Sequence, residues 1–323
     1  MLNRLGRRPR RVQRWFFATD VHGSTRCFRK FLAAAQVYSA DVLLLGGDIA
    51  GKGIVPIIAE ADRYTASFQG ERLAVEAAGL ESLRERITFN GFYPHTCGPE
   101  GLEQLRDPHF RAEVFARLIR AQVTEWNDLA ATRLSADVRC IVTPGNDDPW
   151  MLDDELNAAE RLEFPEGQLV RVGPVQLASL GGVNPTPWHT EREYTEADLA
   201  DQIDTIVRDW EPEDGRLAFN FHCPPLASGL DTAPELDDSL RPIVRHGQVQ
   251  VASMGSRAVR DAIRRYQPTV TLHGHIHEAQ GVYRIGQTRC FNPGSDYSSG
   301  VLKGIVVDLD ARGECCGYVF TAG

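Results

Sequence analysis

The fold is decided by the stretch WFFATDVH, residues 15–22, in which a short apolar run leads directly into a polar D-x-H segment. Such a run is typical of a buried strand. Ser24 can cap a following helix, whose apolar positions at i, i+3, i+4 and i+7 are Phe28, Phe31, Leu32 and Ala35. The next apolar run, residues 42–45, predicts a second strand that ends before Asp48. Strand, helix and strand in this order predict an α/β fold.

The same pattern returns three times further along the chain. Residues 138–143 lead to Asn146, residues 217–221 lead to His222, and residues 269–272 lead to His273, Gly274 and His275. Open α/β sheets place their sites beyond the carboxyl ends of the strands, so we expect these polar residues to meet at one edge. Other apolar runs, at 170–179, 282–285 and 305–309, predict a second sheet packed on the first.

Composition limits the class of protein. The 323 residues are 42% apolar and 24% charged, which is ordinary for a globular chain, and the formal net charge is −9. This charge argues against broad nonspecific affinity for nucleic acid. No apolar run of about 18 residues and no secretory leader is found, so we expect a soluble cytoplasmic protein. The seven cysteines lack C-x-x-C spacing, so we expect neither a disulfide framework nor a zinc knuckle.

The chain divides into an arm and one domain. Residues 1–14 hold six arginines and are predicted to be a disordered arm, either a solvated tail or a contact for nucleic acid or an anionic surface. Residues 15–323 are predicted to form the domain, with an insertion or cap at about 51–137. Within this insertion we expect a hairpin of residues 54–59 and 64–68 and helices near 72–84 and 110–131. Two later helices are predicted to begin after caps at Thr195 and Ser256.

The motifs behind the strands are individually weak. Asp20-x-His22, Gly47-Asp48 and Gly145-Asn146 are also typical of turns, and a lone histidine such as His222 is more often structural than not. The segment GHIH, residues 274–277, is stronger, because alternate residues of an extended segment point the same way and bring two imidazoles together. His273 precedes the glycine and is predicted to be structural. All five motifs occur in order behind predicted strands, a coincidence at about the one-per-cent level.

Together these motifs resemble those of the calcineurin-like metallophosphoesterases, in the order that this family uses. The resemblance spans residues 15 to about 310. The segments NPGS at 292–295 and PTPW at 185–188 are similar to the prokaryotic branch that resembles cyclic-nucleotide phosphodiesterases. The resemblance implies a four-layer α/β/β/α sandwich with a helical insertion, a metallophosphoesterase domain at 15–323, and metal-dependent hydrolysis of phosphoesters.

The resemblance also implies a set of ligands for two divalent metal ions. Its pattern assigns Asp20, His22 and His277 to one metal, Asn146, His222 and His275 to the other, and Asp48 to both. Imidazole and carboxylate ligands suit Mn, Fe and Zn, and a shared carboxylate holds two cations close together. Two metal ions in such a site acidify a bridging water, and the resulting hydroxide attacks phosphorus in line.

One position departs from the family pattern. Asp147 stands where the family most often has a histidine that binds phosphate and protonates the leaving oxygen. Two divalent cations against Asp20, Asp48 and a hydroxide leave a net charge of about +1, which an ionised Asp147 would cancel. We therefore expect a bias toward phosphodiesters, with Asp147 shaping the pocket or, if its pKa is raised, acting as the acid. The expected catalytic residues are Asp147, Asn146 and His222.

Substrate and function class stay open at several points. His189 and His95 are candidate substrate-binding residues, and Tyr93 is another. Candidate substrates are small phosphoesters such as a cyclic nucleotide, another nucleotide or a phospholipid-derived diester, and also a nucleic-acid end. One alternative is a phosphomonoesterase or protein phosphatase with the same metals. The other is a non-catalytic scaffold that keeps only the fold. The sequence does not set the identity of the metals or the oligomeric state.

Overall fold

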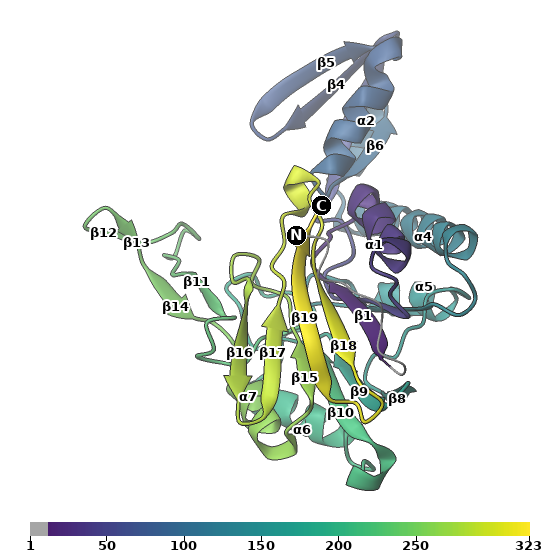
Figure 1. Ribbon diagram of the computed structural model, residues 1–323. Coiled ribbons are helices and arrows are strands. Elements are labelled where there is room, and N and C mark those ends of the chain that lie inside the picture. Colours follow the sequence, from purple (N-terminus) through teal and green to yellow (C-terminus); the bar gives the residue numbers. More distant parts are fainter. Residues whose placement is uncertain (1–11) are drawn as a thin grey trace.

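Two β-sheets lie face to face and helices cover their outer surfaces (Figure 1). The structure, a computed structural model, describes residues 12–323. Both sheets mix parallel and antiparallel strands, and segments with helical period alternate with them along the chain. The predicted four-layer α/β/β/α sandwich is therefore confirmed.

The first sheet has five strands in the order β19-β18-β1-β2-β7. Their bounds are Gln13–Ala18 for β1, Val42–Gly46 for β2, Arg139–Thr143 for β7, Lys303–Leu309 for β18 and Cys315–Ala322 for β19. β1, β2 and β7 run parallel, and β18 pairs antiparallel with β1. The prediction that 305–309 joins the second sheet is wrong, because periodicity identifies a buried strand without specifying its neighbour.

The second sheet has six strands in the order β16-β17-β15-β10-β9-β8. Their bounds are Leu169–Val172 for β8, Val175–Leu180 for β9, Arg216–Phe221 for β10, Val270–Leu272 for β15, Gly281–Ile285 for β16 and Thr288–Asn292 for β17. The central strands β9, β10, β15 and β17 are parallel, so their carboxyl ends lie at one edge.

The alternation of side chains along β1 explains how one strand serves two cores. Trp15 and Phe17 face the second sheet, where they join a buried cluster with Leu177 and Leu272. Phe16, one residue out of phase, faces the helices on the other side. A period of two places successive side chains on opposite faces, so a continuously apolar strand is required where both faces are buried.

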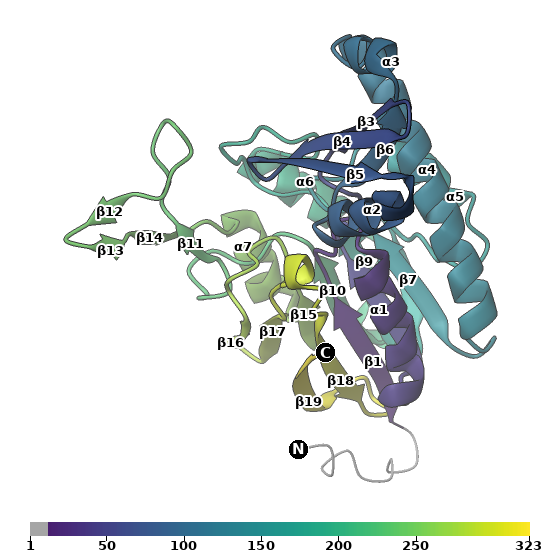
Figure 2. The same ribbon diagram turned by 90° about the horizontal axis from the view of Figure 1, so that it is seen from above.

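Two helical layers complete the sandwich (Figure 2). The first sheet is covered by α1 (Thr25–Val37), α4 (Pro108–Arg133) and α5 (Met151–Asn157), and the second by α6 (Glu196–Ile206) and α7 (Arg257–Tyr266). The three predicted caps are present: the backbone N–H groups of Cys27, Asp198 and Val259 donate to the hydroxyls of Ser24, Thr195 and Ser256. Each such cap satisfies an N–H that the helix itself leaves unpaired.

The insertion forms a small sheet of its own above the sandwich (Figure 1). Its order is β5-β4-β3-β6, with bounds Ile54–Glu60 for β3, Arg63–Phe68 for β4, Glu71–Glu76 for β5 and Tyr93–Cys97 for β6. It carries the short helices α2 (Leu80–Phe89) and α3 (Pro99–Gln104). The predicted hairpin is confirmed, but the predicted helix at 72–84 is wrong. Leu73 and Val75 alternate along β5, and the helical period begins only at Leu80.

Helix α4 leaves the insertion and packs on the main sandwich. It confirms the helix predicted at 110–131, and its Trp126 ring stacks on Phe28 of α1 with 4.1 Å between ring centroids. The limits predicted for the domain and for the insertion at about 51–137 remain a prediction.

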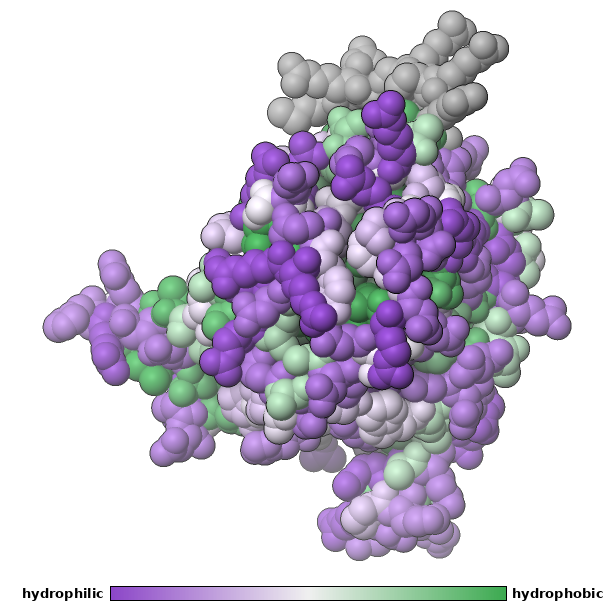
Figure 3. All heavy atoms as spheres, turned by 90° about the horizontal axis from the view of Figure 1, so that it is seen from below, coloured by the Kyte–Doolittle hydropathy of each residue, from purple (hydrophilic) through white to green (hydrophobic). Residues whose placement is uncertain are grey.

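A thin projection, formed by residues 232–253, extends from the second sheet (Figures 1 and 3). It consists of two short ribbons, β11 (Thr232–Pro234) with β14 (Val251–Ser253) and β12 (Val244–Arg245) with β13 (Gln248–Val249). Apolar atoms, green in Figure 3, gather on it, and Val244, Val249 and Val251 are exposed. This projection was not among the elements predicted from the sequence.

The disordered segment predicted at 1–14 extends too far toward the C-terminus, because the structure places its last residue in a strand. Arg14 lies in β1, is buried, and its Nε donates to Asp308 Oδ1 of β18 at 2.7 Å. Its backbone N–H donates to Asp41. Residues 1–11, with the other five arginines, lie outside the described residues. Among residues 12–323, no helix combines the length and the apolar character needed to cross a bilayer.

Trp126→Ala is expected to destabilise the protein by about 3–5 kcal/mol, because it removes a large, fully buried ring from the core between α1 and α4. Urea unfolding followed by circular dichroism measures the loss. Trp188→Ala, which removes a ring that is 59% exposed, is the matched control and should change stability by no more than about 0.5 kcal/mol. Equal stability of the two variants would contradict this packing.

Candidate metal centre

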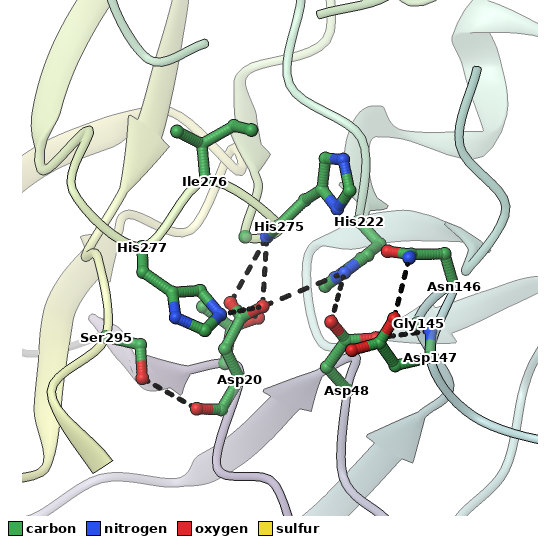
Figure 4. Close-up of polar contacts among 12 residues, drawn as sticks. Asp20, Asp48, Gly145, Asn146, Asp147, His222, His275, Ile276, His277 and Ser295 are labelled. Atoms are coloured by element: carbon green, nitrogen blue, oxygen red, sulfur yellow. Dashed lines mark hydrogen bonds and ion pairs between the residues drawn. The ribbon is translucent and has the colours of Figure 1, made fainter. Parts of the chain in front are cut away.

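The predicted ligands lie just beyond the carboxyl ends of strands from both sheets (Figure 4). Asp20 follows β1 and Asp48 follows β2 in the first sheet, while His222 follows β10 and His275 follows β15 in the second. These strand ends share one edge of the sandwich, so residues far apart in the chain become neighbours. The structure brings together all seven predicted positions: Asp20, His22, Asp48, Asn146, His222, His275 and His277.

The carboxylates and imidazoles form two overlapping groups. Within each group, the ligand atoms all lie within 4.8 Å of one another. The members are Asp20, His22, Asp48 and His277 in one group, and Asp48, His222 and His275 in the other. Asp48 belongs to both groups, which is the position that the family resemblance implies for a shared ligand.

The spacing of the ligand atoms suits a central ion better than direct hydrogen bonds. His222 Nε2 lies 3.4 Å from Asp48 Oδ2, and His277 Nε2 lies 3.3 Å from Asp20 Oδ1. Charge-assisted hydrogen bonds of this type are shorter, at about 2.7–2.9 Å. An ion that binds two tetrahedrally placed ligands at about 2.0–2.1 Å separates them by roughly 3.3–3.4 Å. The observed distances fit the second arrangement.

Buried polar atoms without a hydrogen-bond partner also indicate that the cluster is built to bind a metal ion. Asn146 Oδ1 and His222 Nε2 are buried and have no hydrogen-bond partner in the described part of the chain. The other ring nitrogen of His222, Nδ1, lies 2.9 Å from the carbonyl oxygen of Gly46. Such a contact holds the proton on Nδ1 and directs the Nε2 lone pair toward the cluster. Leaving buried polar atoms unpaired costs about 1–3 kcal/mol each, and bound cations would remove that cost where they coordinate them.

The ionisation of the cluster reflects its two buried carboxylates. Burial alone would lower the pKa of His222, but the charges of Asp48 and Asp20 raise this pKa to about 10. His275 lacks this compensation, and burial with the charge of His222 lowers its pKa to about 4. Burial raises the pKa of Asp48, but the positive charge of His222 lowers it well below its usual range. In the metal-free protein, the His222 proton therefore supplies the positive charge that the carboxylates require.

Four of the ligands adopt a strained backbone conformation. Asp20, His22, Asp48 and His275 have φ values of 52°, 41°, 50° and 65°, in the left-handed region that non-glycine residues rarely occupy. Each costs about 1–3 kcal/mol and persists only where the surroundings impose it. Here the N–H groups of Asp20 and His22 donate to the carbonyls of Gly47 and Asp48, both at 2.9 Å. These two hydrogen bonds hold the Asp20 and Asp48 loops side by side in this conformation.

The motif glycines are required by close approach. A Cβ at Gly47 would lie 2.1 Å from His222 Nδ1, and one at Gly145 would lie 2.3 Å from Asp48 Oδ1. Real contacts of this kind stay above about 3 Å, so any side chain here would displace a ligand.

Asp147 lies at the edge of the cluster and remains partly open to solvent. Its backbone N–H donates to Asp48 Oδ1 at 2.9 Å, and its own Oδ1 accepts from Asn146 Nδ2 at 3.0 Å. Partial burial and the charge of Asp48 raise its pKa to about 7. The sequence left two roles open for Asp147, which could shape the pocket or act as the acid. Both roles require its side chain to lie beside the predicted ligands, and the structure places it there.

Three residues near the cluster were missed by the sequence analysis. Tyr297 packs its ring 4.7 Å from that of His22, and Lys52 Nζ lies 5.6 Å from the Tyr297 ring centroid. Asp148 is fully buried and accepts from the backbone N–H groups of Ile49, Ala50 and Gly145, which ties the Asp48 loop to the Asn146 loop. Only the acidic pair at 147–148 could have drawn attention to Asp148.

The remaining candidates lie elsewhere or serve the fold. His273 Nδ1 lies 2.8 Å from Phe221 O and Nε2 lies 2.7 Å from Thr271 Oγ1, so both ring nitrogens are used, as a structural role requires. The hydroxyl of Tyr93 is buried, accepts from Gly51 N and bonds to Gln122. His95 lies on β6 and His189 on an exposed loop, and within residues 12–323 neither bonds to a ligand. Their role in substrate binding stays a prediction.

Comparisons with known proteins place the fold. No family model matches the chain. An uncharacterized protein of Methanocaldococcus jannaschii, MJ1162, is 26% identical over 162 residues, which are 50% of this chain and 66%, slightly under two thirds, of that protein.

Two solved structures align along nearly the whole chain. The structure of TT1561 of Thermus thermophilus has 15% identity, covers 97% of this chain and 98% of its own, and gives a TM-score of 0.53. A second structure has the same identity and coverage and a TM-score of 0.57. Likeness at this identity concerns the fold alone, and both alignments agree with the α/β fold predicted for the chain.

The affinity of the centre for a divalent metal is expected to rise with pH. His222 holds its proton up to a pKa of about 10, so an ion that binds Nε2 must displace it. Between about pH 6 and about pH 9, affinity should increase roughly tenfold per unit for each proton displaced. Calorimetric titration with Mn in buffers of different ionisation enthalpy counts these protons. His109→Gln, which alters an exposed histidine of α4, should keep the same slope. An affinity independent of pH would contradict the coupling.

Proposed function

We propose that this protein is a metal-dependent phosphoester hydrolase with a preference for phosphodiesters. The observation that carries the proposal is the position of Asp48 between two groups of buried ligands. A pair of divalent cations held there would supply a water of lowered pKa and a positive clamp on the phosphoryl oxygens.

The donor set suits Mn, Fe or Zn. Asp20, His22 and His277 would hold one ion, Asn146, His222 and His275 the other, and Asp48 both. The contacts that fix the histidine loop support this assignment. Asn292 Nδ2 donates to the carbonyls of Gly274 and Ile276, and Ser295 Oγ donates to Asp20 O at 2.6 Å. The NPGS segment therefore holds the loop against β1 and keeps its imidazoles aimed at the carboxylates.

Two charged side chains at the edge of the site bear on the substrate. Lys52 adds a positive charge near His22 and His277, where it would attract an anionic substrate. Asp147 opposes a second negative charge on that substrate whenever it is ionised. A diester carries one negative charge and a monoester near neutral pH carries nearly two, so ionised Asp147 disfavours the monoester more, while Lys52 attracts both substrates. The raised pKa of Asp147 also supports its alternative role, donation of a proton to the leaving oxygen.

The diester preference is tested with bis-p-nitrophenyl phosphate and p-nitrophenyl phosphate in the presence of Mn. We expect faster hydrolysis of the diester, and Asp147→Asn should narrow the ratio of the two kcat/KM values by about tenfold, or about 1.4 kcal/mol. Asp154→Asn makes the same charge change at an exposed position of α5 and should leave the ratio unchanged. A faster monoester would favour a phosphomonoesterase or protein phosphatase.

Loss of the shared carboxylate should abolish turnover. Asp48→Ala and His222→Ala are each expected to lower kcat/KM by at least about a thousandfold, because each removes a ligand. Elemental analysis of wild-type protein after supply of Mn accompanies the assay. Normal activity of Asp48→Ala would overturn the assignment, and less than one metal per wild-type chain would favour a non-catalytic scaffold.

A further inference from the structure

We propose that Thr190 and Glu193 are positioning residues that fix the orientation of the Asn146 amide, so that its oxygen faces a metal ion. The proposal rests on the proposed function, because it concerns a ligand of the same site.

A chain of hydrogen bonds links the three residues. Asn146 Nδ2 donates to Thr190 Oγ1 at 3.1 Å, and Thr190 Oγ1 donates to Glu193 Oε1 at 2.8 Å. At the far end of the amide, Asn146 Oδ1 is buried and has no partner among the described residues. The amide is therefore held by its nitrogen, and its oxygen is left free for a ligand role.

The chemistry of the chain decides which way the amide points. The carboxylate of Glu193 can only accept, so the Thr190 hydroxyl must give its single proton to Glu193. Thr190 Oγ1 then offers only lone pairs to Asn146, and the amide must present its NH2 group to them. A flipped amide would place Asn146 Oδ1 next to the lone pairs of Thr190 Oγ1, where neither oxygen has a proton to donate. It would also turn the NH2 group toward the cations. Asp147 Oδ1 favours the same orientation, but Thr190 imposes it whether or not Asp147 is protonated.

The Glu193 carboxylate is itself rigidly placed. It accepts from the backbone N–H of Thr190 at 2.7 Å, from the backbone N–H of Thr186 at 2.9 Å and from the Thr186 hydroxyl. Its backbone is bridged to Val183, just past the end of β9. The orienting group is thus anchored on a sheet end and not on a free loop.

A second tether joins the same two segments through the backbone. Buried Arg192 donates through Nε to the carbonyl of Asp148 at 2.8 Å and through Nη2 to that of Pro149 at 3.2 Å, and it pairs with Asp153. The Asn146 loop therefore keeps its path if the Thr190 hydroxyl is removed. Loss of that hydroxyl should leave the amide oriented by Asp147 Oδ1 alone, and only while Asp147 is ionised, without unfolding the loop.

The test compares Thr190→Val with Thr190→Ser. Valine is nearly isosteric with threonine but lacks the hydroxyl, while serine retains it. Thr186→Val is the matched control, since it also removes a hydroxyl that donates to Glu193 but one that does not bond to Asn146. Mn binding to each full-length protein is measured by titration calorimetry, and the melting temperature is recorded without metal.

For Thr190→Val we expect the affinity for one of the two Mn ions to fall by about 10–100-fold, with the other ion little affected. Thr190→Ser and Thr186→Val should stay within a few-fold of wild type, and the metal-free melting temperatures should agree. Wild-type affinity for both ions in Thr190→Val would overturn the proposal. So would an equal loss at both sites with a lowered melting temperature, which would indicate a general structural role. A wild-type chain that binds less than one Mn would overturn the proposed function, and this proposal with it.

Discussion

The two buried carboxylates of Asp20 and Asp48 are the constraint on which the rest of the site depends. Each is almost fully buried, and bringing two negative charges together away from water is costly unless positive charge compensates them. Without metal the raised pKa of His222 provides that compensation, and a pair of cations would do so more completely. Strained backbone at four ligands and glycines without room for a Cβ both serve to keep the carboxylates in place.

Much of this arrangement could be predicted from the sequence because it depends on local pattern. Apolar runs that end in polar residues locate the strand ends, and strand ends in an α/β sheet meet at one edge. The helix caps at Ser24, Thr195 and Ser256 are equally local, since each cap bonds within three residues of itself. The fold class and the convergence of the seven predicted ligands therefore follow from features that a single chain displays.

What the sequence could not predict depends on contacts between distant segments. The pairing of β18 with β1 joins residues nearly 300 positions apart, and no periodicity specifies it. Asp148 bonds to backbone groups about a hundred residues away, and Thr190 bonds to Asn146 across 44 residues. The helix predicted at 72–84 was wrong for a different reason. A strand of period two runs directly into a helix there, and a window that spans both resembles one helix.

Anomalous diffraction from crystals of the Mn-loaded protein would show whether two metal ions share Asp48. We expect two anomalous peaks about 3.5–4 Å apart, with the carboxylate of Asp48 between them. One peak should lie beside Asp20 and His277, and the other beside Asn146 and His275. A single peak, or peaks that Asp48 does not contact, would contradict this sharing of Asp48.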